Sequence, residues 1–349
     1  MGIGNKFKKL EAGQKKAMQQ PPLINLDEQQ LGQLQDKREL VQQPPSYVQA
    51  VDLSNIKQGD YFDVILKKLA TIVNEKQYQK IYPHNRLTKI ASDISCRVDF
   101  KKISNQFKFG DVEIAIDLCV LGLFDSLMYC DDSGSMIYED DGDRWNSDLP
   151  TIIEKSAEIT TIFDVDGISV RFFNSNQKKD NIVDPQGVTE LIKTINPSGM
   201  TPMGTNLRKR VIDPYLELVR MQINGGQLLD IKPLYVLIIT DGAPNGESKS
   251  KTEDTIVYAR CELIKLGLGG QEITYQFAQV GKDKGATQFL DYLDNHPSIG
   301  QFIDATSDYE TEEAQWLKMS NGQLQMTPHL YMMKLFLGAI DSEWDSKDE

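Results

Sequence analysis

Residues 124–135 read FDSLMYCDDSGS. The apolar run from Phe124 to Cys130 stops abruptly at an Asp-Asp-Ser-Gly-Ser loop. A short apolar run that ends in a turn is typical of a buried strand. A second run, Leu234 to Ile239, stops in the same way at Thr240-Asp241-Gly242. The sequence therefore predicts two buried strands whose ends both carry acidic loops.

Strands and helices alternate outward from these two runs. Further strands are predicted at 168–173, 273–280 and 302–305. Helices are predicted at 149–163, 185–195, 206–223, 252–266 with Thr252 as its N-cap, around 289–293, and at 327–340. Such alternation predicts an α/β fold with a doubly wound, mostly parallel sheet flanked by helices.

Four regions follow from these patterns. Residues 1–52 are rich in Gln and Pro and predict a flexible extension, because little apolar surface is available to bury. Residues 53–123 have apolar residues at helical spacing and predict a helical subdomain, with 112–123 either a buried helix or a strand. The α/β domain covers 124–310, and 311–349 is a helical extension with an acidic tail.

The amino-acid composition disfavours several classes of partner and location. A net charge of −13 and a pI near 4.9 disfavour nucleic acid as the main partner, since binding phosphates needs a basic face. No apolar run is long enough for a membrane span, and the N-terminus has no apolar signal region. The four cysteines lack metal-type spacing. We therefore expect reduced thiols and a cytoplasmic protein.

Three polar loops gather hard oxygen ligands. They contribute Asp131, Ser133 and Ser135 from the first loop, Thr201 from the loop before the helix at 206–223, and Asp241 from the third. Ligands of open parallel sheets collect at the carboxyl ends of the strands. Two carboxylates with three hydroxyls suit Mg²⁺, with Mn²⁺ or Ca²⁺ as alternatives.

Asp-x-Ser-x-Ser followed by a distant Thr and a distant Asp resembles the metal-ion-dependent adhesion site of von Willebrand factor A domains. All five positions of that motif are present. The segments YCDDSGSM, DGISVRFFN, GMTPMGTNLR and LIITDGAPNGE are similar to cytosolic, fungal-type members of this family. The resemblance implies that the serines and Thr201 bind the ion directly or nearly so. It also implies that Asp131 and Asp241 hold it directly or through water.

A second motif lies in the extension. Pro44, Pro45 and Tyr47 form a PPxY sequence, the ligand of WW domains. A preformed polyproline segment can dock on aromatic rings with little loss of entropy. The alternative is a linker with two prolines and a tyrosine.

Three functions remain open. The first is a cation-dependent protein-binding adaptor, without catalysis, whose metal accepts an Asp or Glu of a partner. The second is a Mg²⁺-dependent hydrolase or phosphoryl-transfer enzyme, which is disfavoured because no His, Lys or Cys lies in the three loops. The third is a structural subunit with an idle metal site. Membrane association is not expected.

Overall fold

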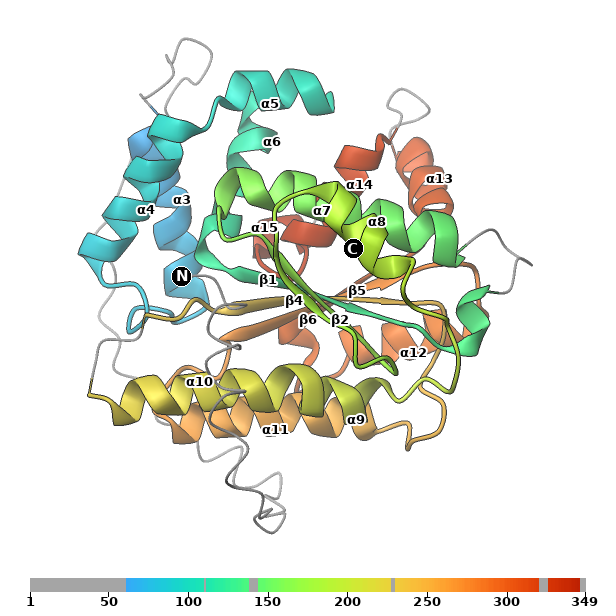
Figure 1. Cartoon of the computed structure of the whole chain (residues 1–349). Coiled ribbons are helices and arrows are strands. Elements are labelled where there is room, and N and C mark those ends of the chain that lie inside the picture. Colours follow the sequence, from blue (N-terminus) through green and yellow to red (C-terminus); the bar gives the residue numbers. More distant parts are fainter. Residues whose placement is uncertain (1–60, 110, 138–143, 227–229, 320–325, 346–349) are drawn as a thin grey trace.

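A computed structural model describes residues 61–109, 111–137, 144–226, 230–319 and 326–345 (Figure 1). The predicted extension over residues 1–52, with Pro44, Pro45 and Tyr47, lies outside the described residues. Among the residues described, no helix is long and apolar enough to span a bilayer.

A six-stranded sheet forms the centre of the molecule, in the order β3-β2-β1-β4-β5-β6. All neighbours are parallel except β2 and β3, which pair antiparallel. The strands are β1 (Asp125–Cys130), β2 (Ile168–Phe172), β3 (Lys179–Ile182), β4 (Leu234–Thr240), β5 (Ile273–Gln279) and β6 (Ile303–Thr306). The predicted fold class, a doubly wound and mostly parallel sheet, is confirmed.

Successive residues of the central strands enter opposite hydrophobic layers. Leu127 and Tyr129 of β1 belong to one cluster, and Met128 and Cys130 belong to the other. Every residue of β1, β4 and β5 is buried. A strand with two buried faces tends to be a continuous apolar run, as in β4, whereas β5 also buries Gln276 and Gln279.

Helices cover both faces of the sheet (Figure 1). One cluster joins the sheet to α9 (Met203–Leu207), α10 (Asp213–Asn224), α11 (Lys251–Lys265) and α12 (Lys284–Asp294). The other joins it to α7 (Leu149–Phe163), α8 (Pro185–Ile192) and α14 (Pro328–Leu337). Two further helices follow the last strand or end the described chain, α13 (Tyr309–Met319) and α15 (Ser342–Asp345).

The residues before β1 are helical. They form α3 (Phe62–Glu75), α4 (His84–Arg97), α5 (Phe100–Phe107), α6 (Val112–Asp117) and the 3₁₀ helix η4 (Leu118–Leu123). Their apolar side chains belong to the same cluster as α7 and α14, so this region shares its core with the sheet. Lys68 of α3 binds both Asp117 and Asp341, 2.9 Å and 2.7 Å away, which ties it to the C-terminal segment.

Three local expectations differ from the structure. The antiparallel edge strand β3 has no counterpart among the predicted strands. The helix predicted at 206–223 is divided into α9, the π-helix η7 (Arg208–Ile212) and α10. Thr252 is not an N-cap: Ser250 holds that position, and Thr252 is buried in the first turn of α11.

Candidate functional site

The predicted metal residues lie at the point where the chain reverses its direction across the sheet. β1 leads to β2 on one side, and its other neighbour is β4. Cys130 and Ile239 are partners in the β1–β4 register, and the amide of Asp131 donates to the carbonyl of Ile239 over 2.8 Å. In open α/β sheets such a switch point is where ligands bind. The loops after β1 and β4 therefore start side by side.

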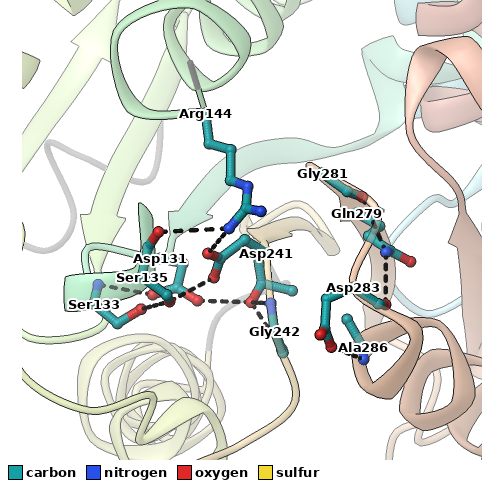
Figure 2. Close-up of polar contacts among 11 residues, drawn as sticks. Asp131, Ser133, Ser135, Arg144, Asp241, Gly242, Gln279, Gly281, Asp283 and Ala286 are labelled. Atoms are coloured by element: carbon teal, nitrogen blue, oxygen red, sulfur yellow. Dashed lines mark hydrogen bonds and ion pairs between the residues drawn. The ribbon is translucent and has the colours of Figure 1, made fainter. Parts of the chain in front are cut away.

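Hydrogen bonds from side chains and from one backbone amide connect these loops into a single cluster (Figure 2). Asp131 accepts from the Ser133 amide at 2.8 Å and from the Thr240 hydroxyl at 2.7 Å. The hydroxyl oxygens of Ser133 and Ser135 are 3.0 Å apart. Ser135 in turn donates to Oδ1 of Asp241 over 3.0 Å. Four of the five predicted ligands thus belong to one hydrogen-bonded cluster.

Thr201 lies in the loop beside this cluster. The amide of Gly134 donates to the carbonyl of Gly199 at 3.1 Å, which fastens the Thr201 loop to the DxSxS loop. Thr201 and Asn245 exchange two backbone hydrogen bonds, each 3.1 Å long, which fasten it to the loop after β4. Thr201 is buried. The structure therefore holds Thr201 between the other two loops by its backbone.

The carboxyl group of Asp131 carries the clearest electrostatic perturbation of the site. Burial, and then the neighbouring Asp241, raise the pKa of Asp131 to about 7. The hydrogen bonds from Thr240 and Ser133 act in the opposite direction. A carboxyl group must lose its proton to hold a cation, so a cation bound by Asp131 would displace that proton.

Arg144 is a member of this cluster that the sequence reasoning missed. Its Nη1 lies 2.8 Å from Oδ2 of Asp241 and 3.5 Å from the carbonyl oxygen of Ser135. Both partners of the ion pair are buried, with side-chain exposures of 9% for Arg144 and 1% for Asp241. Arg144 begins the short π-helix η6 (Arg144–Asp148) and follows an acidic stretch, and no motif in the sequence marks it.

Asp132, the second aspartate of the Asp-Asp pair, anchors a neighbouring loop. Asp132 accepts from the amides of Asn174 and Ser175, at 2.6 Å and 2.7 Å. Asn174 then donates through its side chain to the carbonyl of Met200, over 2.9 Å. Asp132 thereby fixes the loop after β2, and through it the Thr201 loop. Its buried position raises its pKa, which these hydrogen bonds partly offset.

The spacing of the oxygens fits a small divalent cation. In octahedral coordination with each oxygen about 2.1 Å from the ion, adjacent ligands are about 3.0 Å apart. The hydroxyl oxygens of Ser133 and Ser135 are 3.0 Å apart, and that of Ser135 lies 3.0 Å from Oδ1 of Asp241. These separations are also those of ordinary hydrogen bonds. Among the described residues, this cluster included, no group of three or more His, Cys, Asp or Glu side chains gathers in the manner of a metal site. Such a cation would therefore depend on hydroxyl ligands as well as carboxylates.

Comparison with known proteins gives similarity in structure only. No family model matches the sequence, and no curated protein matches it. The manganese-loaded TRAP protein of Plasmodium vivax is similar over 54% of this chain and 71% of its own, with 18% identity and a TM-score of 0.32. Proximal thread matrix protein 1 from the mussel byssus is similar over 56% of this chain, with 16% identity and a TM-score of 0.33. This chain spans 47% of the mussel protein.

Proposed function

We propose that the chain is a von Willebrand A-type module that binds a protein partner through a divalent cation at a complete metal-ion-dependent adhesion site. The observation that carries this proposal is the hydrogen-bonded chain from Ser133 through Ser135 to Asp241, at the switch point of the sheet. Asp131, Ser133, Ser135, Thr201 and Asp241 would hold Mg²⁺, with Mn²⁺ and Ca²⁺ as alternatives. Bound there, the cation supplies a coordination position for an Asp or Glu of the partner.

The surroundings favour binding over hydrolysis. A general base needs an oxygen or nitrogen that can receive a proton from the substrate or from water. No His, Lys or Cys lies in the three loop segments 131–135, 199–202 and 240–242 to act as a base or nucleophile. The carboxylates of Asp131 and Asp241 are the proposed ligands of the cation, and a carboxylate bound to a cation is a weak base. We therefore propose no catalytic role for the site.

The adaptor role rests on the extension. Pro44, Pro45 and Tyr47 would recruit a WW-domain protein, while the cation site binds a second partner. The four free cysteines support a cytoplasmic setting for both interactions. Loss of WW-domain binding in Tyr47→Ala, with cation binding unchanged, is the expected result for this part of the proposal.

Calorimetric titration with Mn²⁺ tests the site directly. We expect one binding site in the full chain, lost in Asp131→Asn and Asp241→Ala and weakened in Thr201→Ala. Asp283→Asn is the matched control, since this carboxylate lies near the cluster (Figure 2) but caps α12 through the Ala286 amide at 2.7 Å. Unchanged Mn²⁺ binding in Asp131→Asn would contradict the proposed ligand set.

Partner binding is tested in a second experiment. A protein captured by the wild-type chain in Mg²⁺ should be released by EDTA, and Asp241→Ala should fail to capture it. Capture that persists in EDTA would show that the cation does not bridge the two proteins. If EDTA lowers the melting temperature but leaves capture unchanged, the cation has a structural role only.

A further inference from the structure

We propose that Arg144 is a built-in cation of this site, which weakens the binding of a divalent ion and makes the loaded site selective for a carboxylate. This inference rests on the proposed cation site and adds a residue that the von Willebrand A motif does not include.

The guanidinium of Arg144 lies inside the cluster. Figure 2 shows its side chain extending toward Asp241 and Ser135. The two carboxylate oxygens of Asp241 have different donors. Oδ1 accepts from Ser135 at 3.0 Å, and Oδ2 accepts from Arg144 at 2.8 Å. The carboxylate that would serve the divalent ion therefore already binds a positive charge.

The guanidinium packs closely against the loop after β5. Gly281 has a φ of +75°, and a Cβ added there would lie 2.5 Å from Nε of Arg144. The backbone beside it is held to β4, because the amide of Val280 donates to the carbonyl of Thr240 at 2.9 Å. Arg144 thus packs directly against a main chain that is anchored next to Asp241. It belongs to the buried structure of the site and not to its solvated rim.

The charge balance gives the consequence. With both carboxylates ionised, Asp131 and Asp241 supply two negative charges and Arg144 offsets one of them. A divalent ion then enters a site with one net negative charge instead of two, and it shares Asp241 with a neighbouring like charge. Like charges in a buried cluster repel with little screening. Arg144 should therefore weaken ion binding when no partner is present.

The same balance favours an anionic partner. Once loaded, the cluster carries one net positive charge, whereas without Arg144 it would be neutral. One carboxylate restores neutrality, and the binding of ion and carboxylate then becomes mutually favourable. The partner class is accordingly a protein that presents a single Asp or Glu side chain, and its uncharged Asn or Gln counterpart should bind poorly.

The first test uses Mn²⁺ alone, measured in chloride buffer by the paramagnetic resonance of the free ion. Arg144→Gln should bind Mn²⁺ at least about tenfold more tightly than wild type, while Arg144→Lys, which keeps the charge, should stay within about threefold. Gly281→Ala keeps the arginine but displaces its guanidinium, so it should also tighten binding. Equal or weaker binding in Arg144→Gln overturns the inference.

The second test adds a carboxylate. Replacing chloride by acetate at equal ionic strength should strengthen Mn²⁺ binding more in wild type than in Arg144→Gln. An equal or larger effect in Arg144→Gln overturns the inference. Asp131→Asn distinguishes this failure from that of the proposed function. Suppose that Arg144→Gln gives either of the contradicting results, while wild type binds Mn²⁺ and Asp131→Asn does not. The cation site then stands, and only the role of Arg144 fails. If neither wild type nor Arg144→Gln binds Mn²⁺, both proposals fail.

Discussion

The hydroxyl of Thr240 donates to Oδ2 of Asp131 over 2.7 Å and so connects the ends of β4 and β1. Thr240 is fully buried and also lies within 3.1 Å of the carbonyl of Gly242. One side chain thereby orients a carboxylate of the site and the turn that carries Asp241. Residues that orient a metal ligand in this way set its affinity without touching the ion.

Thr240→Val should lower both stability and cation affinity. The substitution keeps the shape but removes the donor to a buried carboxyl, at a cost of about 1–3 kcal/mol in the free energy of unfolding. Mn²⁺ affinity should fall about tenfold, as is common for groups that orient a ligand. Urea denaturation and Mn²⁺ titration measure the two effects. Thr240→Ser keeps the hydroxyl and serves as the control; if it behaves like Thr240→Val, the hydrogen bond is not the cause.

The sequence made the central strands predictable, and it marked the loops that carry the proposed ligands, because each has a local signal. Leu234 to Ile239 is buried on both faces, so its apolar run marks β4 directly. β3 has no such signal, since three of its four residues are polar. Its strand conformation depends on pairing with β2 and on the ion pair of Arg171 with Asp180, 2.7 Å apart, which joins residues from the two strands.

Arg144, within the site, likewise has no local signal in the sequence. The DxSxS pattern marks Asp131, Ser133 and Ser135 because the motif is contiguous, and the order of the loops adds Thr201 and Asp241. Arg144 joins them only through the path of η6 and the close approach of Gly281. A contact created by packing between distant segments leaves no periodicity or spacing to detect.

Asp132 and Asp131 are adjacent but should respond differently to substitution. Asp132→Ala removes the acceptor of the Asn174 and Ser175 amides, and we expect a loss of about 2–3 kcal/mol in the free energy of unfolding. Mn²⁺ should still bind, because Asp132 anchors a loop and is not a proposed ligand. Denaturation and Mn²⁺ titration of Asp132→Ala and Asp131→Asn make the comparison. Complete loss of Mn²⁺ binding in folded Asp132→Ala would assign Asp132 to the ligand set.

Stability should depend on pH through His329. This residue of α14 stacks on Phe107 of α5 with ring centroids 4.2 Å apart, and its Nε2 lies 3.5 Å from Nζ of Lys155 and 3.8 Å from Glu158. Burial and then Lys155 lower the pKa of His329 below its usual 6.5, while Glu158 partly opposes them. The unfolded chain therefore takes up a proton at a higher pH than the folded protein. The contribution of neutral His329 to the free energy of unfolding is fully present above about pH 6.5, and it decreases as the pH falls below that value.

The variant His329→Phe isolates this contribution, because it keeps a ring to stack on Phe107 but cannot be protonated. Other groups titrate in the same range, so the relevant quantity is the difference between the two proteins. From about pH 7.5 to about pH 5.5, wild type should lose more stability than His329→Phe in urea denaturation. His84→Phe, at an exposed position, is the control. An identical pH dependence in wild type and His329→Phe would contradict the assignment.

Gly204 permits the close approach of two helices that position the Thr201 loop. A Cβ at Gly204 of α9 would lie 2.5 Å from the backbone nitrogen of Thr252 in α11, and the Thr255 hydroxyl donates to the Gly204 carbonyl at 3.1 Å. The obstructing atoms belong to the main chain, so the helices must separate. Gly204→Ala should therefore reduce the free energy of unfolding by about 1–3 kcal/mol. Because α9 begins two residues after Thr201, Mn²⁺ affinity should fall as well.

Gly242→Ala, whose added Cβ meets nothing within 4 Å, is the steric control for the denaturation measurement. Equal stability of Gly204→Ala and wild type would mean that the two helices can separate without loss, and that their packing does not fix the Thr201 loop.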